Sequence, residues 1–334
     1  MSSIGIITNA ASGKDIRRLV SYATTIDNQE KVNIVKRIVL AAQAMGVDTV
    51  WFMPDTFQIG WAVIEDLSRD EKLTADCRLL DIPLTATSQD TTAAAAEMER
   101  LGVGCVVVLG GDGTSRAVAK GIKKVPLLPL STGTNNVYPE MLEGTVAGMA
   151  AAQFSDPAIC CIRDKQIEVT LNGSLRGIAL IDAVISDDLC VGSKAIWDAS
   201  KLQHIFVTRC HPASIGFSTA AGCLHIVRDT DDYGLAVELR SEGEKIIAPI
   251  AAGVLSELEI WQAKRMPLDC PETLLLQEEC MVALDGEREL RGHAGDTLTF
   301  TVTRHGPWRV QAKRALEEAV RREFFAAGRM IDPT

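Results

Sequence analysis

The sequence of 334 residues contains no apolar stretch approaching the roughly 18 uninterrupted residues of a membrane-spanning helix. Its first residues, MSSIGIITN, lack the basic segment that opens a signal sequence. The nine cysteines form no Cys-x-x-Cys pair, and their odd number does not suit a disulfide framework. We therefore expect a cytoplasmic protein that has no membrane partner.

Basic residues are outnumbered, since 34 Lys and Arg stand against 44 Asp and Glu and leave a net charge of −10. A negative protein repels phosphate backbones, so nucleic-acid binding is not expected. The five histidines show neither an H-E-x-x-H pattern nor the spacing of a zinc site, and no G-x-S-x-G motif stands out. Aromatic residues make up only 5%, but a hydrophobic share of 47% provides an aliphatic core and excludes wholesale disorder.

The length favours two domains, and the first differs in pattern from the second. Up to about residue 155, short β-rich runs alternate with longer helical patterns, which predicts a Rossmann-like parallel sheet with helices on both faces. Strands are predicted at 4–8, 49–53, 78–83, 105–109 and 126–130, and helices between a capping box at 27–30 and Gly46 and at 57–67, 91–101 and 115–120. We assign this α/β nucleotide-binding domain to residues 1–155.

From residue 156 to 310, runs of Val, Ile, Leu and Thr are separated by Gly, Asp and Asn. This spacing is typical of antiparallel strands and predicts a β-rich sandwich or barrel that holds the substrate. The predicted strands are 166–171, 178–185, 205–208, 235–239, 246–250, 258–261, 281–284 and 297–303. A last helix over 311–330 carries an apolar stripe, and we expect it to pack back on the first domain.

A glycine-rich loop, Gly110-Gly111-Asp112-Gly113-Thr114, follows the apolar strand 105–109. Glycines let the backbone turn sharply, and amides at the start of the next helix attract an anion. A phosphate site and a plain tight turn explain the glycines equally well. A carboxylate that only faces phosphate is unfavourable, so Asp112 is a candidate metal ligand or proton acceptor.

Two more loops of small polar residues follow predicted strands of the same domain. Residues 131–136, STGTNN, follow the strand 126–130, and residues 9–14, NAASGK, follow the first strand. Ligands of open α/β sheets collect at the carboxyl ends of the strands. Three such loops on one edge predict a nucleotide site.

These segments carry a family resemblance. GGDGT at 110–114 with the later Gly-Thr-Asn loop resembles the NAD kinase and diacylglycerol kinase superfamily, and NAASGKDIRRL, STGTNNVYP and IDAVISDD resemble its ATP-NAD kinase-like branch, the acetoin catabolism protein X group. The resemblance spans nearly the whole chain. It implies an α/β domain followed by a β-rich domain with nucleotides bound between them, and ATP-dependent phosphoryl transfer with Mg²⁺.

The resemblance also implies roles for individual residues. Asp112 would accept the proton of the acceptor hydroxyl. The residues implied for the donor nucleotide are Asn9, Ser12, Gly13, Gly110, Gly111, Gly113, Thr114, Thr134 and Asn135, and those implied for the acceptor are Asn136, Asp182, Ser214 and Asp285. Without the resemblance, Asp285-Gly286-Glu287 would be taken for an ordinary hairpin turn. The sequence assigns no metal ligands.

The sequence leaves several phosphoryl acceptors open. NAD, giving NADP, is the leading acceptor, although the strand that carries an Asn-Glu pair in NAD kinases has Ile181 and Asp182 here. One alternative is a lipid or other small-alcohol kinase, because STGTNN resembles the lipid-kinase loop. Another is a nucleotide-binding regulator of acetoin catabolism that has lost turnover. Self-association as a dimer or tetramer is expected by analogy with related kinases.

Overall fold

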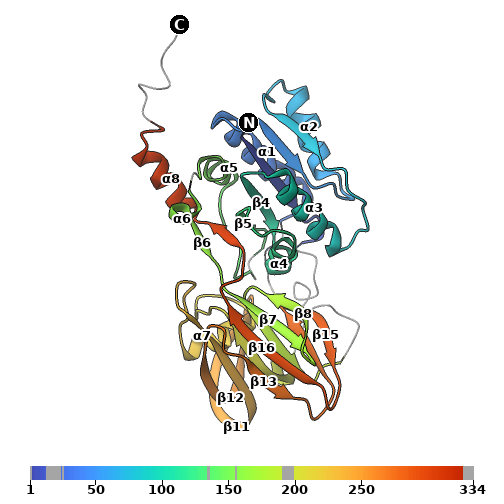
Figure 1. The fold of residues 1–334 in the computed structure, drawn as a ribbon, viewed down its shortest axis with the longest axis vertical. Coiled ribbons are helices and arrows are strands. Elements are labelled where there is room, and N and C mark those ends of the chain that lie inside the picture. The colour runs from blue at the N-terminus through green and yellow to red at the C-terminus, as the bar shows by residue number, and fades with distance from the viewer. Residues whose placement is uncertain are drawn as a thin grey trace.

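The computed structural model describes residues 2–12, 24, 26–133, 136–154, 156–189 and 199–325. Within these residues a seven-stranded sheet forms one end of the molecule and two antiparallel sheets form the other (Figure 1). This arrangement is the predicted one, a Rossmann-like α/β part joined to a β-rich part. None of the described helices has the length and apolar content to cross a membrane.

The seven-stranded sheet has the order β3-β2-β1-β4-β5-β17-β6. Its members are β1 (Ser3–Thr8), β2 (Thr49–Phe52), β3 (Asp76–Leu79), β4 (Cys105–Gly110), β5 (Leu127–Ser131), β6 (Cys161–Arg163) and β17 (Trp308–Val310). The first five strands are parallel to their neighbours. Every residue of β4 is buried, because helices cover both faces of a parallel sheet.

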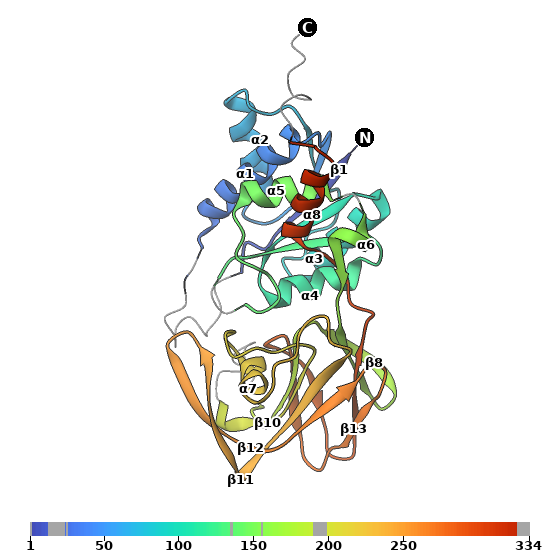
Figure 2. The ribbon, with the colours of Figure 1, turned by 90° about the vertical axis from the view of Figure 1, so that its left-hand side faces the viewer.

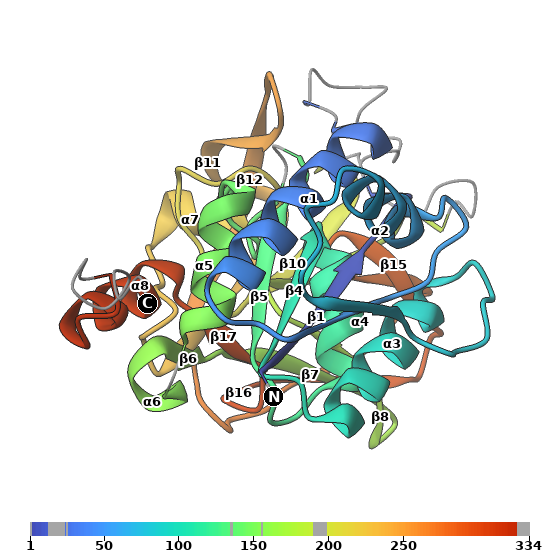
Figure 3. The same ribbon diagram turned by 90° about the horizontal axis from the view of Figure 1, so that it is seen from above.

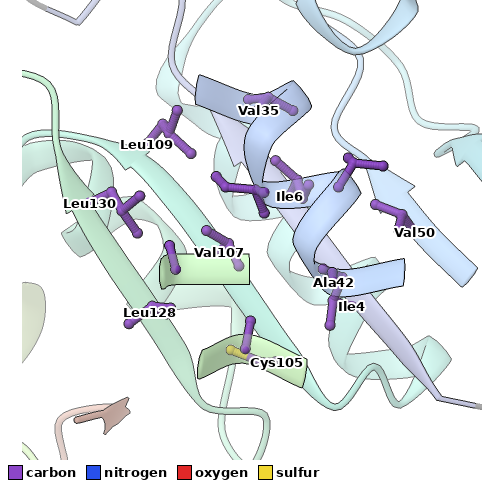
Figure 4. Packing of buried hydrophobic residues seen from close by; sticks show 14 of the residues in the cluster. Ile4, Ile6, Val35, Ala42, Val50, Cys105, Val107, Leu109, Leu128 and Leu130 are labelled. Carbon is purple, nitrogen blue, oxygen red and sulfur yellow. The ribbon is translucent and has the colours of Figure 1, made fainter. Parts of the chain in front are cut away.

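The helices of this part are α1 (Asn28–Ala44), α2 (Ile59–Arg69), α3 (Ser88–Leu101), α4 (Asp112–Gly121), α5 (Gly144–Gln153), α6 (Pro157–Cys160) and α8 (Ala312–Arg321). Helices α1, α2 and α5 cover one face of the sheet, and α3 and α4 cover the other (Figure 3). On the first face Val35 and Ala42 of α1 pack against Ile6, Val50 and Val107 (Figure 4). The predicted cap of α1 is confirmed, since the Asp27 side chain accepts the Glu30 N–H.

The β-rich part contains a six-stranded sheet, β12-β11-β10-β9-β14-β15, and a four-stranded sheet, β13-β16-β7-β8. The strands are β7 (Gln166–Leu171), β8 (Ser174–Ala179), β9 (Asp182–Ser186), β10 (Leu202–Val207), β11 (Tyr233–Ala251), β12 (Val254–Pro267), β13 (Glu272–Leu275), β14 (Cys280–Leu284), β15 (Glu287–Gly292) and β16 (Thr297–Thr303), and a 3₁₀ turn (Ala199–Lys201) precedes β10. The rings of Phe206 and Phe300 stack between the sheets, 4.0 Å apart. Helix α7 (Phe217–Leu224) packs on the other face of the larger sheet, whose strands β11 and β12 form a long hairpin (Figure 2).

Several predicted boundaries were wrong. The predicted strand 178–185 is two strands, because β8 ends at Ala179 in one sheet and β9 begins at Asp182 in the other. The predicted strands 235–239 and 246–250 both belong to β11, whose register with β12 shifts between Leu239 and Glu244. Helix α4 begins at Asp112 rather than at Ser115. The predicted strand 78–83 ends as β3 at Leu79.

The chain passes between the two parts more than once. Strands β6 and β17 lie just inside the two ends of the predicted 156–310 domain, yet both pair within the N-terminal sheet. Helix α8 then contacts α5 and α6 on the N-terminal part. The end of the predicted helix 311–330 lies outside the described residues. The domain bounds 1–155 and 156–310 stay a prediction.

Candidate functional site

The three small polar loops meet at the carboxyl edge of the N-terminal sheet, because β1, β4 and β5 are neighbours. The Asn9 side-chain amide donates to the Thr114 hydroxyl across 2.8 Å, which joins the loop after β1 to the loop after β4. The hydroxyls of Ser12 and Thr132 share a hydrogen bond of 3.0 Å, which joins the loop after β1 to the loop after β5. Hydrogen bonds therefore join the three loops at the sheet edge where the sequence places them.

The glycines after β4 are required by close neighbours. A Cβ on Gly110 would lie 2.5 Å from the Cβ of Thr114, and one on Gly111 would lie 2.7 Å from the Asn136 side-chain oxygen. Gly111 is the N-cap of α4, so the start of that helix and its partial positive charge lie at this edge. The arrangement suits a bound phosphate.

Asp112 is the first residue of α4 and is half-buried. Its Oδ1 atom accepts the backbone N–H of Val137 at 3.0 Å and that of Tyr138 at 2.7 Å. These bonds fix the carboxylate against the segment that follows β5. An ionised carboxylate held by N–H donors at a helix start is oriented to accept a proton.

Asn136, which the resemblance implied for the acceptor, lies in the loop after β5. The Asn136 amide nitrogen donates to the Ser131 hydroxyl at 2.8 Å and to the Gly133 carbonyl at 3.3 Å, so Asn136 stabilises its own loop. Gly13, Thr134 and Asn135 lie outside the described residues.

The Asp285 turn, between β14 and β15, reaches the same region from the β-rich part. Asp285 and Gly286 both have positive φ, 49° and 78°, as the predicted hairpin turn requires. The buried Asp285 carboxylate accepts the backbone N–H groups of Leu180, Ile181 and Asp182 at 2.9, 2.8 and 3.2 Å. It therefore caps the break between β8 and β9.

Burial raises the pKa of Asp285 to about 6, against the opposing effects of Arg116 and of the N–H donors. The negative charge of Asp112 adds to this rise, so the two carboxylates sense each other. The turn also faces the glycine loop directly, since a Cβ on Gly113 would lie 2.7 Å from Glu287 Oε1. Asp112 and Asp285 therefore lie close enough for their charges to interact.

Arg116 links α4 to this turn and was missed in the sequence. The side chain is 2% exposed, and its guanidinium lies 3.6 Å from Asp285, 3.2 Å from Glu287 and 2.7 Å from Glu289. Burial acts against the charged guanidinium, but the three carboxylates raise its pKa overall. Its spacing of four from Asp112 puts both residues on one helix face, which is a signal that the sequence contained.

Lys31 is a second missed residue. Its side chain is fully buried, and its ammonium donates to the carbonyls of Asn9 at 2.9 Å and Ser12 at 3.0 Å. The cation therefore fixes the loop after β1 from beneath. Lys31 lies on the apolar stripe of α1 four residues before Val35, and a charge on such a stripe is the signal that could have identified it.

Asp182 and Ser214 were both predicted for the acceptor side, and they lie in different parts of the structure. Asp182 is the buried first residue of β9, and its carbonyl accepts the Asp285 N–H at 2.8 Å, so it belongs to the Asp285 turn. Ser214 lies between β10 and α7, where its N–H donates to the His211 carbonyl at 3.1 Å.

The acidic residues here do not form a cage for a metal. Among the described residues, no three His, Cys, Asp or Glu side chains are grouped to hold an ion. Asp112 and Asp285 accept backbone N–H groups, and Glu287 and Glu289 pair with Arg116. Magnesium in nucleotide sites commonly takes substrate phosphates and waters as ligands. These residues supply no preformed magnesium site.

The comparisons with known proteins cover both parts of the chain. Residues 4–158 match the ATP-NAD kinase N-terminal domain, and residues 165–305 match the acetoin catabolism protein X C-terminal domain. The chain is 38% identical over 317 residues to acetoin catabolism protein X of Cupriavidus necator, which covers 90% of this chain and 88% of that protein.

Solved structures share the fold at low sequence identity. Yeast NADH kinase complexed with NADH is similar with a TM-score of 0.52 and 14% identity, over 96% of this chain and 86% of that chain. A putative diacylglycerol kinase from Bacillus anthracis str. Sterne has a TM-score of 0.44 and 12% identity, over 92% and 98% of the two chains. The first of these shows that the chain has an NADH kinase-like fold.

Proposed function

The chain belongs to the acetoin catabolism protein X family, and we propose that it is an ATP-dependent phosphotransferase whose acceptor is a hydroxyl group of NAD. The observation that carries this proposal is the Asp112 carboxylate, held by the N–H groups of Val137 and Tyr138 where the three polar loops meet. The match to the ATP-NAD kinase domain and the NADH kinase-like fold support it.

In this proposal the loops bind the donor nucleotide. The residues assigned to it are Asn9, Ser12, Gly13, Gly110, Gly111, Gly113, Thr114, Thr134 and Asn135. The start of α4 contributes partial positive charge toward the phosphates. Magnesium would enter with the nucleotide, and we assign it no protein ligand.

Asp112 is proposed to accept the proton of the acceptor hydroxyl as that oxygen attacks the terminal phosphorus of ATP. The bond from this phosphorus to the β–γ bridging oxygen breaks, and ADP leaves. Phosphoryl transfer needs mainly positioning and charge stabilisation, so one oriented carboxylate beside a phosphate-binding edge is a sufficient minimal arrangement. Asn136, Asp182, Ser214 and Asp285 are proposed for the acceptor side. Within that group the three amide hydrogen bonds of Asp285 favour shaping the site over contacting the acceptor. Self-association and a cytoplasmic location stay predictions.

The test is detection by mass spectrometry of a gain of one phosphate after incubation with ATP, Mg²⁺ and NAD. Asp112→Asn should lower kcat by about a hundredfold or more, because the proton acceptor is lost. Asp90→Asn is the matched control. Asp90 also lies in a first helical turn and accepts two backbone N–H groups, from Thr85 and Ala86, but on α3. Asp90→Asn should retain kcat.

Each other outcome changes a defined part of the proposal. Full turnover by folded Asp112→Asn would contradict the role of that carboxylate. A phosphorylated diacylglycerol or small alcohol from a mixed pool, with NAD unchanged, would replace NAD as the acceptor. ATP binding without a product from any acceptor would support a regulator in place of an enzyme.

A further inference from the structure

One peptide group connects Asp112 to a cation of the β-rich part. The N–H of Tyr138 donates to Asp112 Oδ1 at 2.7 Å, and the carbonyl of the same peptide group, that of Val137, accepts Arg209 Nη2 at 3.0 Å. The same nitrogen also donates to the Tyr138 carbonyl at 3.2 Å. The Arg209 guanidinium, the peptide group and the Asp112 carboxylate therefore form a chain of hydrogen bonds. In such a chain each hydrogen bond polarises the next.

Arg209 is held in place by its surroundings. It follows β10 in the β-rich part, and its side chain is only 17% exposed. The guanidinium lies over the Tyr138 ring, 5.3 Å from its centre, and Nη1 is 3.9 Å from Asp229. Asp229 is in turn bonded to Arg309 at 2.8 Å. The cation therefore keeps one geometry toward the peptide.

The Tyr138 side chain fixes the peptide from the opposite end. It is fully buried, and its hydroxyl donates to Asp164 Oδ2 at 2.6 Å. Arg309 Nε donates to the same oxygen at 2.7 Å. With the ring anchored by Asp164 and the carbonyl by Arg209, the N–H that faces Asp112 has little freedom to turn away.

We propose that Arg209 is a positioning residue for Asp112, acting through the peptide between Val137 and Tyr138 to align and strengthen the N–H that the carboxylate accepts. The inference rests on the proposed function, because it concerns the group that would accept the hydroxyl proton. A stronger donor to the ionised carboxylate favours that form, and only that form accepts a proton.

Other charged groups near Asp112 stay unchanged when Arg209 is replaced. Among the described residues, these groups include Asp285 and Glu287 at the β14–β15 turn and Arg116 of α4. A change in Asp112 titration in an Arg209 variant is therefore attributable to Arg209, through the peptide connection together with the direct effect of its positive charge.

The experiment compares Arg209→Gln and Arg209→Lys with wild type in two measurements. The first is the pH profile of kcat/KM, and the second is the ¹³C NMR titration of the Asp112 carboxyl, assigned by its loss in Asp112→Asn. For Arg209→Gln we expect the acid limb and the carboxyl midpoint to move together to higher pH by on the order of half a unit. Arg209→Lys, which keeps the cation, should move both by less.

Arg304→Gln is the matched control. Arg304 also donates to several backbone carbonyls, among them those of Asp229 and Thr230, but it makes no described bond to the peptides that serve Asp112. It should leave both midpoints unchanged. Equal carboxyl midpoints in wild type and Arg209→Gln, or a loss of rate at every pH without a shift, would overturn the inference. If wild type forms no product, the proposed function fails, and the NMR titration alone decides the role of Arg209.

Discussion

Replacing Asp285 with asparagine should change how the free energy of unfolding depends on pH. Burial raises the pKa of Asp285 to about 6 from an ordinary 3.8. The folded protein therefore holds this proton more tightly than the unfolded chain does. Ionisation of Asp285 then lowers stability as the pH rises from about 4 to about 6, because the folded state binds more protons in that window.

The size of the effect follows from the shift. The pKa rises by about two units, and at about 1.36 kcal/mol per unit it corresponds to about 3 kcal/mol. Asparagine does not titrate, so it lacks this dependence. Its carbonyl can still accept the Ile181 N–H, but its amide nitrogen would face Leu180 N–H and Arg116, which costs about 1–3 kcal/mol. Between pH 4 and pH 7 the difference should shift by about 2 kcal/mol in favour of the variant, because the unfolded carboxyl is already half ionised near pH 4.

The assay is urea unfolding of wild type and Asp285→Asn from pH 4 to pH 7, followed by circular dichroism and tryptophan fluorescence. The two probes must give the same transition for a free energy to be defined. Asp296→Asn is the control, because hydrogen bonds from Asn172 and from the His293 backbone lower the pKa of Asp296 and give its contribution the opposite sign. A difference between Asp285→Asn and wild type that is constant over this range would refute the argument.

Two further changes test the loops beside Asp112. Lys31→Met removes the buried ammonium that donates to the half-buried carbonyls of Asn9 and Ser12, so we expect a loss of about 1–3 kcal/mol in unfolding free energy and weaker ATP binding by calorimetry. Unchanged ATP affinity would contradict the role given to this loop. Gly110→Ala places a Cβ 2.5 Å from the Thr114 Cβ, so Thr114 must move. We expect ATP affinity to fall about tenfold or more. An affinity equal to that of wild type would show that the loop tolerates the added methyl group.

The N-terminal sheet could be predicted because its signals are local. Strand β4 is covered on both faces, so it is a continuous apolar run, CVVVL, that ends at a glycine. The start of helix α1 could be predicted from Asp27, whose side chain caps the helix. The meeting of the three loops follows from topology alone, since neighbouring parallel strands end at one edge.

The β-rich part was less predictable because distant residues set its boundaries. Leu180 and Ile181 are apolar and continue a strand pattern, yet the chain changes sheets there. The cause is Asp285, 105 residues after Leu180, whose carboxylate takes the N–H groups that a continuous strand would use in its ladder. The start of α4 at Asp112 is similar, since the bonds from Val137 and Tyr138 outweigh the poor helix propensity of Gly113.

The glycine motif explains the anion-binding part of the site but not the surroundings of the Asp112 carboxylate. A glycine loop before a helix binds an anion in many folds, and nothing in it sets the state of a carboxylate. Here the Asp112 carboxylate is bonded to the peptide at Tyr138, and the β-rich part places Arg209 on that peptide and Asp285 within charge interaction of Asp112. The group proposed to accept the proton is thus complete only when both parts of the chain are docked. Because β6 and β17, at the two ends of the β-rich segment, both pair within the N-terminal sheet, the chain connectivity itself constrains this docking.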